Sequence, residues 1–222
     1  MSSRPPSASA IADEDALGGD RALALLHMPA PVRPAVAAMF AVDVAMGDVV
    51  ARATDPNLAR IKLAWWREQL EALDGGAPPA EPRLQAVAAE LIGRGIAGRD
   101  VAALEPGWAT LLDDRADPEH VAGRGVVLFD LGGRLLGEGD AKLGAAGALY
   151  ALTSVGRRGV PHLIEPARGH GAMLAGHRFP RALRPLTMLA RAALRDLEGE
   201  EAEGSRGRVL AMLRHRWSGR IG

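Results

Sequence analysis

Helix boundaries are marked clearly in this chain, and they restrict its fold more than any other feature. The dipeptides Asp55-Pro56 and Asp117-Pro118 each place a capping acid directly before a proline, which is the pattern of a helix start. Two glycines after Asp74 form a helix stop. Sustained alternation of apolar and polar residues is missing, so strands have little support. We therefore predict an all-α fold.

Proline and glycine positions divide the chain into segments. Apolar and small residues between these breaks predict helices over 20–26, 34–53, 56–73, 84–91, 101–112, 118–136, 141–155, 180–197 and 206–217. Glycines within two of these helices, 118–136 and 141–155, predict a close antiparallel pair. The glycine-rich stretch 159–176 is expected to be irregular, and His170 and His177, which flank a glycine-rich loop, are expected to face solvent.

Composition restricts the class of protein. A length of 222 residues fits a single domain, which we place at residues 17–222, after a flexible N-terminal tail at residues 1–16. Lys and Arg number 27, as do Asp and Glu, so no net charge draws the chain to nucleic acid, and no nucleic-acid partner is expected. Cysteine is absent, which excludes thiolate metal sites and disulfides.

Membrane and metal sites have little support in the sequence. The six histidines include no pair at the i, i+4 spacing of a helical zinc site, so no metal site built on histidine is expected. No apolar run reaches the roughly 18 residues that span a bilayer, so we predict no transmembrane segment. We expect a cytoplasmic protein, with peripheral contact at the inner face of a membrane as an option.

The helix predicted after Pro56 carries a candidate binding face. Arg60 and Arg67 are seven residues apart and share one side of the helix, with Leu63 between them and Trp66 beside it. Two cations next to an indole could hold an anionic head group against an apolar wall. The alternative is that Arg60 pairs with acids on a neighbouring helix while the tryptophans fill the core.

Three segments together resemble the squalene/phytoene synthase family. They read LLHMPAPVR over residues 25–33, AMFAV over 38–42 and RIKLAWWR over 60–67, and a weaker likeness continues through LGAA at 143–146 and the final helices. The resemblance implies an all-α, single-domain bundle of helices around a central apolar cavity. It also implies a substrate class, because the synthases of this family join two prenyl diphosphates head to head.

The resemblance further implies two aspartate-rich motifs that hold magnesium over the diphosphates. At the first motif this chain keeps Asp48 alone, and Asp43 lies about 140° away around the helix. At our best placement of the second motif, the acids are replaced by Ser154, Arg157 and Arg158. We therefore expect no metal-ligating and no catalytic residues. Asp48 could instead pair with Arg52 one turn later.

These departures leave two main hypotheses. The first is a family member that has lost magnesium-dependent prenyl transfer and binds a prenyl diphosphate or lipid, or acts as an assembly factor with a protein partner, similar to the branch that includes a respiratory complex I assembly factor. Its candidate pocket is lined by Asp48, Arg60, Leu63, Trp66 and Arg67. The second is an active head-to-head prenyltransferase of isoprenoid biosynthesis, which would require Mg²⁺. A helical interaction module without a pocket is a third, generic option.

Overall fold

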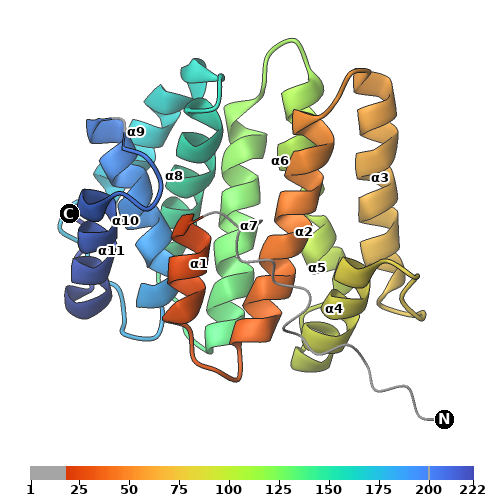
Figure 1. Ribbon diagram of the computed structural model, residues 1–222, viewed down its shortest axis with the longest axis horizontal. Coiled ribbons are helices and arrows are strands. Elements are labelled where there is room, and N and C mark those ends of the chain that lie inside the picture. Colours follow the sequence, from red (N-terminus) through yellow and green to blue (C-terminus); the bar gives the residue numbers. More distant parts are fainter. Residues whose placement is uncertain (1–18, 200) are drawn as a thin grey trace.

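The computed structural model describes residues 19–199 and 201–222, and these residues confirm the predicted all-α class (Figure 1). The predicted tail at residues 1–16 lies outside the described part of the chain. The helices are α1 (Gly19–Leu26), α2 (Arg33–Ala51), α3 (Pro56–Ala72), α4 (Pro82–Glu90), η3 (Ile92–Arg94), α5 (Gly98–Ala102), α6 (Glu105–Ala109), η4 (Thr110–Leu112), α7 (Pro118–Leu136), α8 (Leu143–Gly156), η5 (Pro161–Leu163), α9 (Ile164–Met173), α10 (Arg184–Glu198) and α11 (Arg206–Ser218).

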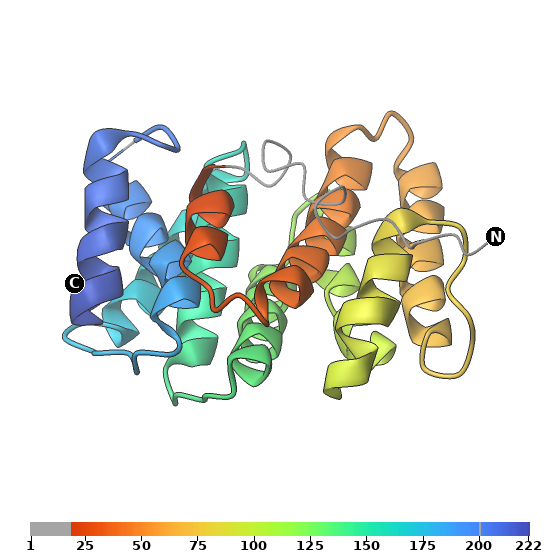
Figure 2. The same cartoon turned by 60° about the horizontal axis from the view of Figure 1, so that its bottom comes forward.

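The long helices stand side by side in a row. Figure 1 shows α3 at one edge, followed by α2, α7 and α8, with α10 and α11 at the opposite edge. Helix α1, the first helix of the described residues, packs beside α10, as the turned view in Figure 2 also shows. In this row α7 stands between α2 and α8 and packs against both of them.

The local start signals act as the sequence predicts. At α3, the Asp55 side chain accepts a hydrogen bond from the Asn57 amide at 2.8 Å, and Pro56 occupies the first helical turn. At α7, Asp117 caps the helix in the same way through the Glu119 amide at 2.8 Å. Both helices therefore begin where an acid precedes a proline.

The crossing of α7 and α8 depends on two glycines that face one another. A Cβ atom placed on Gly125 would lie 2.0 Å from the carbonyl oxygen of Gly147, and one on Gly147 would lie 2.1 Å from that of Gly125. No side chain fits in this space, so glycine is required on both helices. The close pair predicted from the small residues is thus present.

Two expectations for the stretch 159–176 were wrong. The stretch contains α9, in which Gly171 packs closely: a Cβ there would meet Leu194 at 3.0 Å, whereas one on Gly169 would meet no heavy atom within 4 Å. The two histidines do not simply face solvent. His177 Nε2 lies 2.9 Å from the Asp140 carboxylate, and His170 Nδ1 is buried without a hydrogen-bond partner among the described residues.

Helix α2 is 19 residues long and apolar enough, by length and composition, to cross a membrane. Half of its most apolar 18-residue window is buried inside the fold, which is the pattern of a core helix as much as of a membrane span. Phe40 and Met39 are fully buried on it, and it also carries Asp43, whose side chain is completely enclosed. Helix α2 therefore supplies both the core and the polar centre described next.

Candidate functional site

A cavity of about 660 Å³ lies among α1, α2, α7, α8, α10 and α11. Its apolar lining comes from residues such as Val44, Val50, Leu111, Val155 and Val160. Its polar lining contains arginines and carboxylates from segments that are distant in the sequence: Asp20, Arg21, Asp43, Asp48, Arg124, Arg157, Arg158, Asp196, Glu201, Glu203 and Arg208. The cavity therefore combines an apolar wall with a dense set of charges.

The polar centre of the cavity is the Asp43 carboxylate on α2. Arg21 on α1 donates a hydrogen bond to its Oδ2 atom, and Arg124 Nη1 on α7 lies 2.9 Å from Oδ1. The indole Nε1 of Trp108 on α6 donates to Oδ1 at 2.9 Å. Gly47 makes room for this indole, since a Cβ there would come within 2.8 Å of the Trp108 ring. Four helices thus converge on one carboxylate.

The charge state of Asp43 follows from these contacts. Burial alone raises the pKa of its carboxyl, but the charges of Arg124 and Arg21 and the hydrogen bonds from Arg21 and Trp108 outweigh burial and hold the pKa at about 2. Asp43 is therefore ionised at neutral pH. Arg21 also donates from Nε to the Tyr150 hydroxyl at 2.7 Å, which ties α8 to the same centre.

The centre carries more positive than negative charge. Two guanidiniums, from Arg21 and Arg124, surround a single carboxylate, and all three groups are buried. The Cζ atom of Arg124 lies 3.9 Å from the centre of the Trp108 ring, and its Nε and Nη2 atoms have no hydrogen-bond partner among the described residues. A buried cation with unused donors is costly unless an anion compensates it. The floor of the cavity is therefore suited to a negative group.

The opposite wall of the cavity comes from the end of α8. Ser154, Arg157 and Arg158, which replace acids at our placement of the second family motif, all line the cavity, and so does Asp48 from α2. Arg158 makes no ion pair with any described residue. Arg157 is paired with Asp196, and it also donates to the Glu201 carbonyl oxygen at 3.3 Å. The fold thus brings to one cavity the two segments at which we place the family motifs.

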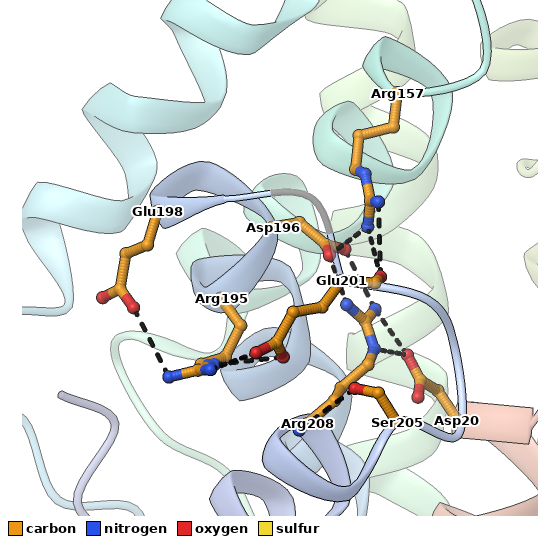
Figure 3. A network of polar contacts seen from close by, with 8 residues as sticks. All are labelled: Asp20, Arg157, Arg195, Asp196, Glu198, Glu201, Ser205 and Arg208. Carbon is orange, nitrogen blue, oxygen red and sulfur yellow. Dashed lines mark hydrogen bonds and ion pairs between the residues drawn. The ribbon is translucent and has the colours of Figure 1, made fainter.

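An ionic network closes one end of the cavity, and Figure 3 shows its members. Arg208 at the start of α11 lies 2.6 Å from Asp20 on α1 and is also paired with Asp196 on α10. Burial raises the pKa of Asp196, although the charges of Arg208 and Arg157 oppose this shift. Glu201 is paired with Arg195. The network therefore joins the first helix to the last two.

The structure places the two predicted pocket arginines elsewhere. Arg60 donates to the Leu112 carbonyl oxygen at 2.9 Å and pairs with Asp113 at 2.6 Å, as the alternative interpretation of this helix expects. Arg67 lies 4.0 Å from Glu105, whose pKa is raised by burial and only partly lowered again by Arg67. Neither arginine lines the large cavity.

The other residues of that predicted face divide between core and a minor pocket. Leu63 is fully buried in the core, and Trp66 is 7% exposed, packed edge-to-face against Trp65. Trp66 and Asp48 both line a smaller pocket of about 310 Å³. The Asp48 carboxylate lies 3.1 Å from Arg52 Nη2, the pairing expected one turn along the helix. Asp48 is thus the one predicted residue that borders both spaces.

The carboxylates of the cavity do not fit a magnesium cluster. Five carboxylates of its lining, Asp20, Asp43, Asp48, Asp196 and Glu201, are each paired with an arginine, and Glu203 is the one acid of the described lining without an ion pair. Within residues 19–199 and 201–222, no three His, Asp or Glu side chains are grouped so that they could hold a metal ion. Magnesium needs several carboxylate or phosphate oxygens that are not already neutralised by guanidiniums. The donor set on the wall instead favours an anionic group.

Sequence reasoning missed Arg21, Trp108, Arg124 and Tyr150, and it set Asp43 aside. A signal existed in two places, because Asp43 and Arg124 are charges inside mostly apolar stretches of helix, and such charges are buried only when paired. Their pairing with each other was not readable, since they lie 81 positions apart.

Comparison with known proteins gives a match to a family model. Residues 17–115 match the model described as squalene/phytoene synthase, a span that contains α1, α2, α3 and Trp108. No curated protein and no solved structure matches the chain.

Proposed function

We propose, from the match of residues 17–115 to the squalene/phytoene synthase family, that this chain binds an anionic prenyl compound or lipid and no longer performs magnesium-dependent prenyl transfer. In this proposal residues 17–222 act as one domain, and the large cavity holds the ligand. The bound state would serve the assembly of a partner protein, by analogy with the non-catalytic branch of the family.

The observation that carries the proposal is the uncompensated positive charge beside Asp43. Arg124 keeps two buried nitrogen atoms without partners among the described residues, and Arg158 has no ion pair there either. A phosphate or diphosphate head group would supply the missing acceptors, because guanidinium binds phosphate oxygens through charge-assisted hydrogen bonds. The valines and alanines between α2 and α8 offer an apolar wall for the attached chain.

The active prenyltransferase remains the alternative, and the position of Asp48 favours it. Asp48 lies on the cavity wall where the family's first metal motif is expected, although it is paired with Arg52. In that alternative, the carboxylate and the substrate phosphates together would hold Mg²⁺. Ionising an allylic diphosphate with so few acids forfeits most of the electrostatic assistance that such a reaction needs.

A turnover assay separates the two functions. Purified protein is incubated with farnesyl or geranylgeranyl diphosphate, with and without Mg²⁺, and released pyrophosphate is measured. We expect no magnesium-dependent release, together with prenyl or phospholipid species in an organic extract of the protein by mass spectrometry. Magnesium-dependent release of pyrophosphate would instead establish the enzyme.

Two variants test whether the ligand binds in the large cavity or on the face of α3. Arg158→Gln removes an exposed cavity cation and is expected to weaken ligand binding roughly tenfold or more, because a hydrogen bond to a charged group contributes about 1.5–3 kcal/mol. The double variant Arg60→Ala with Arg67→Ala tests the face of α3 predicted from the sequence. Loss of ligand in the α3 variant alone, with native helix content, would move the site from the large cavity to α3. Arg115→Gln, an exposed arginine without an ion pair among the described residues, serves as the control.

A further inference from the structure

Ion pairing is distributed unevenly over the chain. In the first two thirds of the described residues, most arginines have an acidic partner, as with Arg60 and Asp113 or Arg134 and Asp100. Toward the C-terminus, a set of arginines has none within 4.0 Å among the described residues: Arg178, Arg181, Arg184, Arg206, Arg214, Arg216 and Arg220. Although the chain as a whole is neutral, this end is strongly basic.

Backbone contacts gather several of these arginines at the end of α11. An isolated antiparallel bridge joins Arg178 to Arg220. Arg178 Nε donates to the Ser218 carbonyl oxygen at 2.8 Å, and Arg184 Nη1 donates to that of Trp217 at 2.6 Å. Burial, and then the positive charges of Arg178, Arg216 and Arg181, lower the pKa of Arg184. The guanidiniums are therefore close enough to repel one another.

Capping of the helix explains only part of this cluster. Cations near the C-terminus of a helix interact favourably with its dipole, and Arg178 and Arg184 satisfy carbonyl oxygens there. Arg181, Arg214 and Arg220 are exposed and donate no side-chain hydrogen bond to any described residue. These three cations make no ion pair and no side-chain hydrogen bond among the described residues, so their charge is available to a partner outside the chain.

The same helix turns apolar side chains outward. Trp217 is 77% exposed and Leu210 is 64% exposed, and their spacing of seven residues places them on one face of α11. Arg206 and Arg214 lie on this face as well, so cations and apolar side chains alternate along it. Helix α11 stands at the outer edge of the molecule in Figure 1 and Figure 2, where its inner side packs against α10. The exposed fractions of Leu210 and Trp217 show that the described residues leave its outer face largely uncovered. We call the face formed by Arg206, Leu210, Arg214 and Trp217 the basic-aromatic face.

We propose that the basic-aromatic face docks on an anionic lipid surface. Tryptophan prefers the boundary between head groups and hydrocarbon, and surface helices combine such anchors with cations that attract anionic lipids. Each arginine near such a surface strengthens binding appreciably, and the attraction is screened within a Debye length. A nucleic acid would satisfy the arginines but leaves Leu210 without an apolar environment. Charge complementarity together with exposed apolar side chains therefore favours a membrane.

The test is sedimentation of the full chain with vesicles of phosphatidylcholine containing about one third phosphatidylglycerol, against vesicles of phosphatidylcholine alone. We expect binding to the anionic vesicles at low salt, a large decrease at high salt, and a blue shift of tryptophan fluorescence on binding. Arg206→Gln with Arg214→Gln is expected to weaken binding by about tenfold or more. Trp217→Gln is expected to weaken it roughly tenfold and to abolish most of the blue shift.

Matched controls lie on the opposite side of the molecule. Ile61→Gln removes an exposed apolar side chain on α3, where Ile61 is 66% exposed, and Lys62→Gln with Arg115→Gln removes two exposed cations. These variants should bind as the unchanged protein does. The proposal is overturned if the unchanged chain does not sediment with anionic vesicles, or if the control variants lose binding to the same degree. It is also overturned if a single-stranded RNA probe binds at least as tightly and is released by the same α11 variants.

Discussion

The Asp43 carboxylate balances one of the two guanidiniums that are buried beside it, so its removal should be costly. Asp43→Asn would leave Arg21 and Arg124 enclosed without a counter-charge. Breaking a buried ion pair on one side costs about 3–5 kcal/mol of unfolding free energy. We expect a loss of this size in urea denaturation followed by circular dichroism.

A nearby aspartate on the same helix supplies the control. Asp48→Asn removes a half-exposed carboxylate paired with Arg52, and such surface pairs contribute about 0–1 kcal/mol. The contribution of Asp43 to the free energy of unfolding should also depend on pH. Because the folded pKa of Asp43 is lowered to about 2, its stabilising effect is complete above its unfolded pKa of about 3.8 and is lost as the pH falls toward 2. Equal losses in the two variants would contradict the role of Asp43.

Among the helices, the α7–α8 crossing is the contact least tolerant of change. Gly125→Ala adds a Cβ that would lie 2.0 Å from a backbone carbonyl oxygen of α8, so the two helices must separate. We expect a loss of about 1–3 kcal/mol or more of unfolding free energy, the range seen when a close-packed core is overfilled. The measurement is again urea denaturation.

A second glycine on α7 makes this prediction specific. A Cβ placed on Gly123 would have no heavy atom of a neighbouring segment within 4 Å, so Gly123→Ala meets open space and should raise helix stability by up to about 1 kcal/mol. The two substitutions are chemically identical and lie two positions apart. If both variants shift stability in the same direction, the close approach of α7 and α8 is not what constrains Gly125.

How far each element was predictable depends on the range of the interaction that forms it. The start of α3 was placed correctly because the Asp55 cap and the following proline act within one turn. Helix α9 was missed because its glycines suggested a loop, whereas Gly171 lies inside the helix and packs closely against Leu194 on α10. Helix caps can be predicted because they depend on adjacent residues, whereas packing depends on residues that are distant in the sequence.

The site follows the same rule. The resemblance located Asp48 and the end of α8, and both border the large cavity. The Asp43 centre could not be assembled from the sequence, because Arg21, Trp108 and Arg124 are 22, 65 and 81 positions away from Asp43. A stripe of cations on α3 suggested a pocket where Arg60 is in fact paired with Asp113. Periodicity shows which residues share a face but not what lies opposite that face.

Ligand binding should raise the free energy of unfolding, and therefore the melting temperature, of the whole molecule. A ligand that binds the folded chain at about 100 times its dissociation constant adds about 2.7 kcal/mol to the unfolding free energy. For a chain of this size, each kcal/mol raises the melting temperature by about 2–4 °C. A prenyl diphosphate is therefore expected to raise the melting temperature by roughly 5–10 °C if it fills the cavity. Calorimetry or thermal circular dichroism would measure the shift.

The effect of Mg²⁺ on the melting temperature should differ from that of prenyl diphosphate. Five of the six described carboxylates that line the cavity are paired with arginines, so Mg²⁺ alone should shift the melting temperature no more than sodium chloride of equal ionic strength. Under the proposed function, guanidiniums hold the phosphates in place of metal ions, so prenyl diphosphate should stabilise the chain to the same extent with Mg²⁺ and with a chelator. Stabilisation that appears only when both Mg²⁺ and the diphosphate are present would show that the cavity still assembles a metal-dependent site, and it would favour the prenyltransferase over the binding protein.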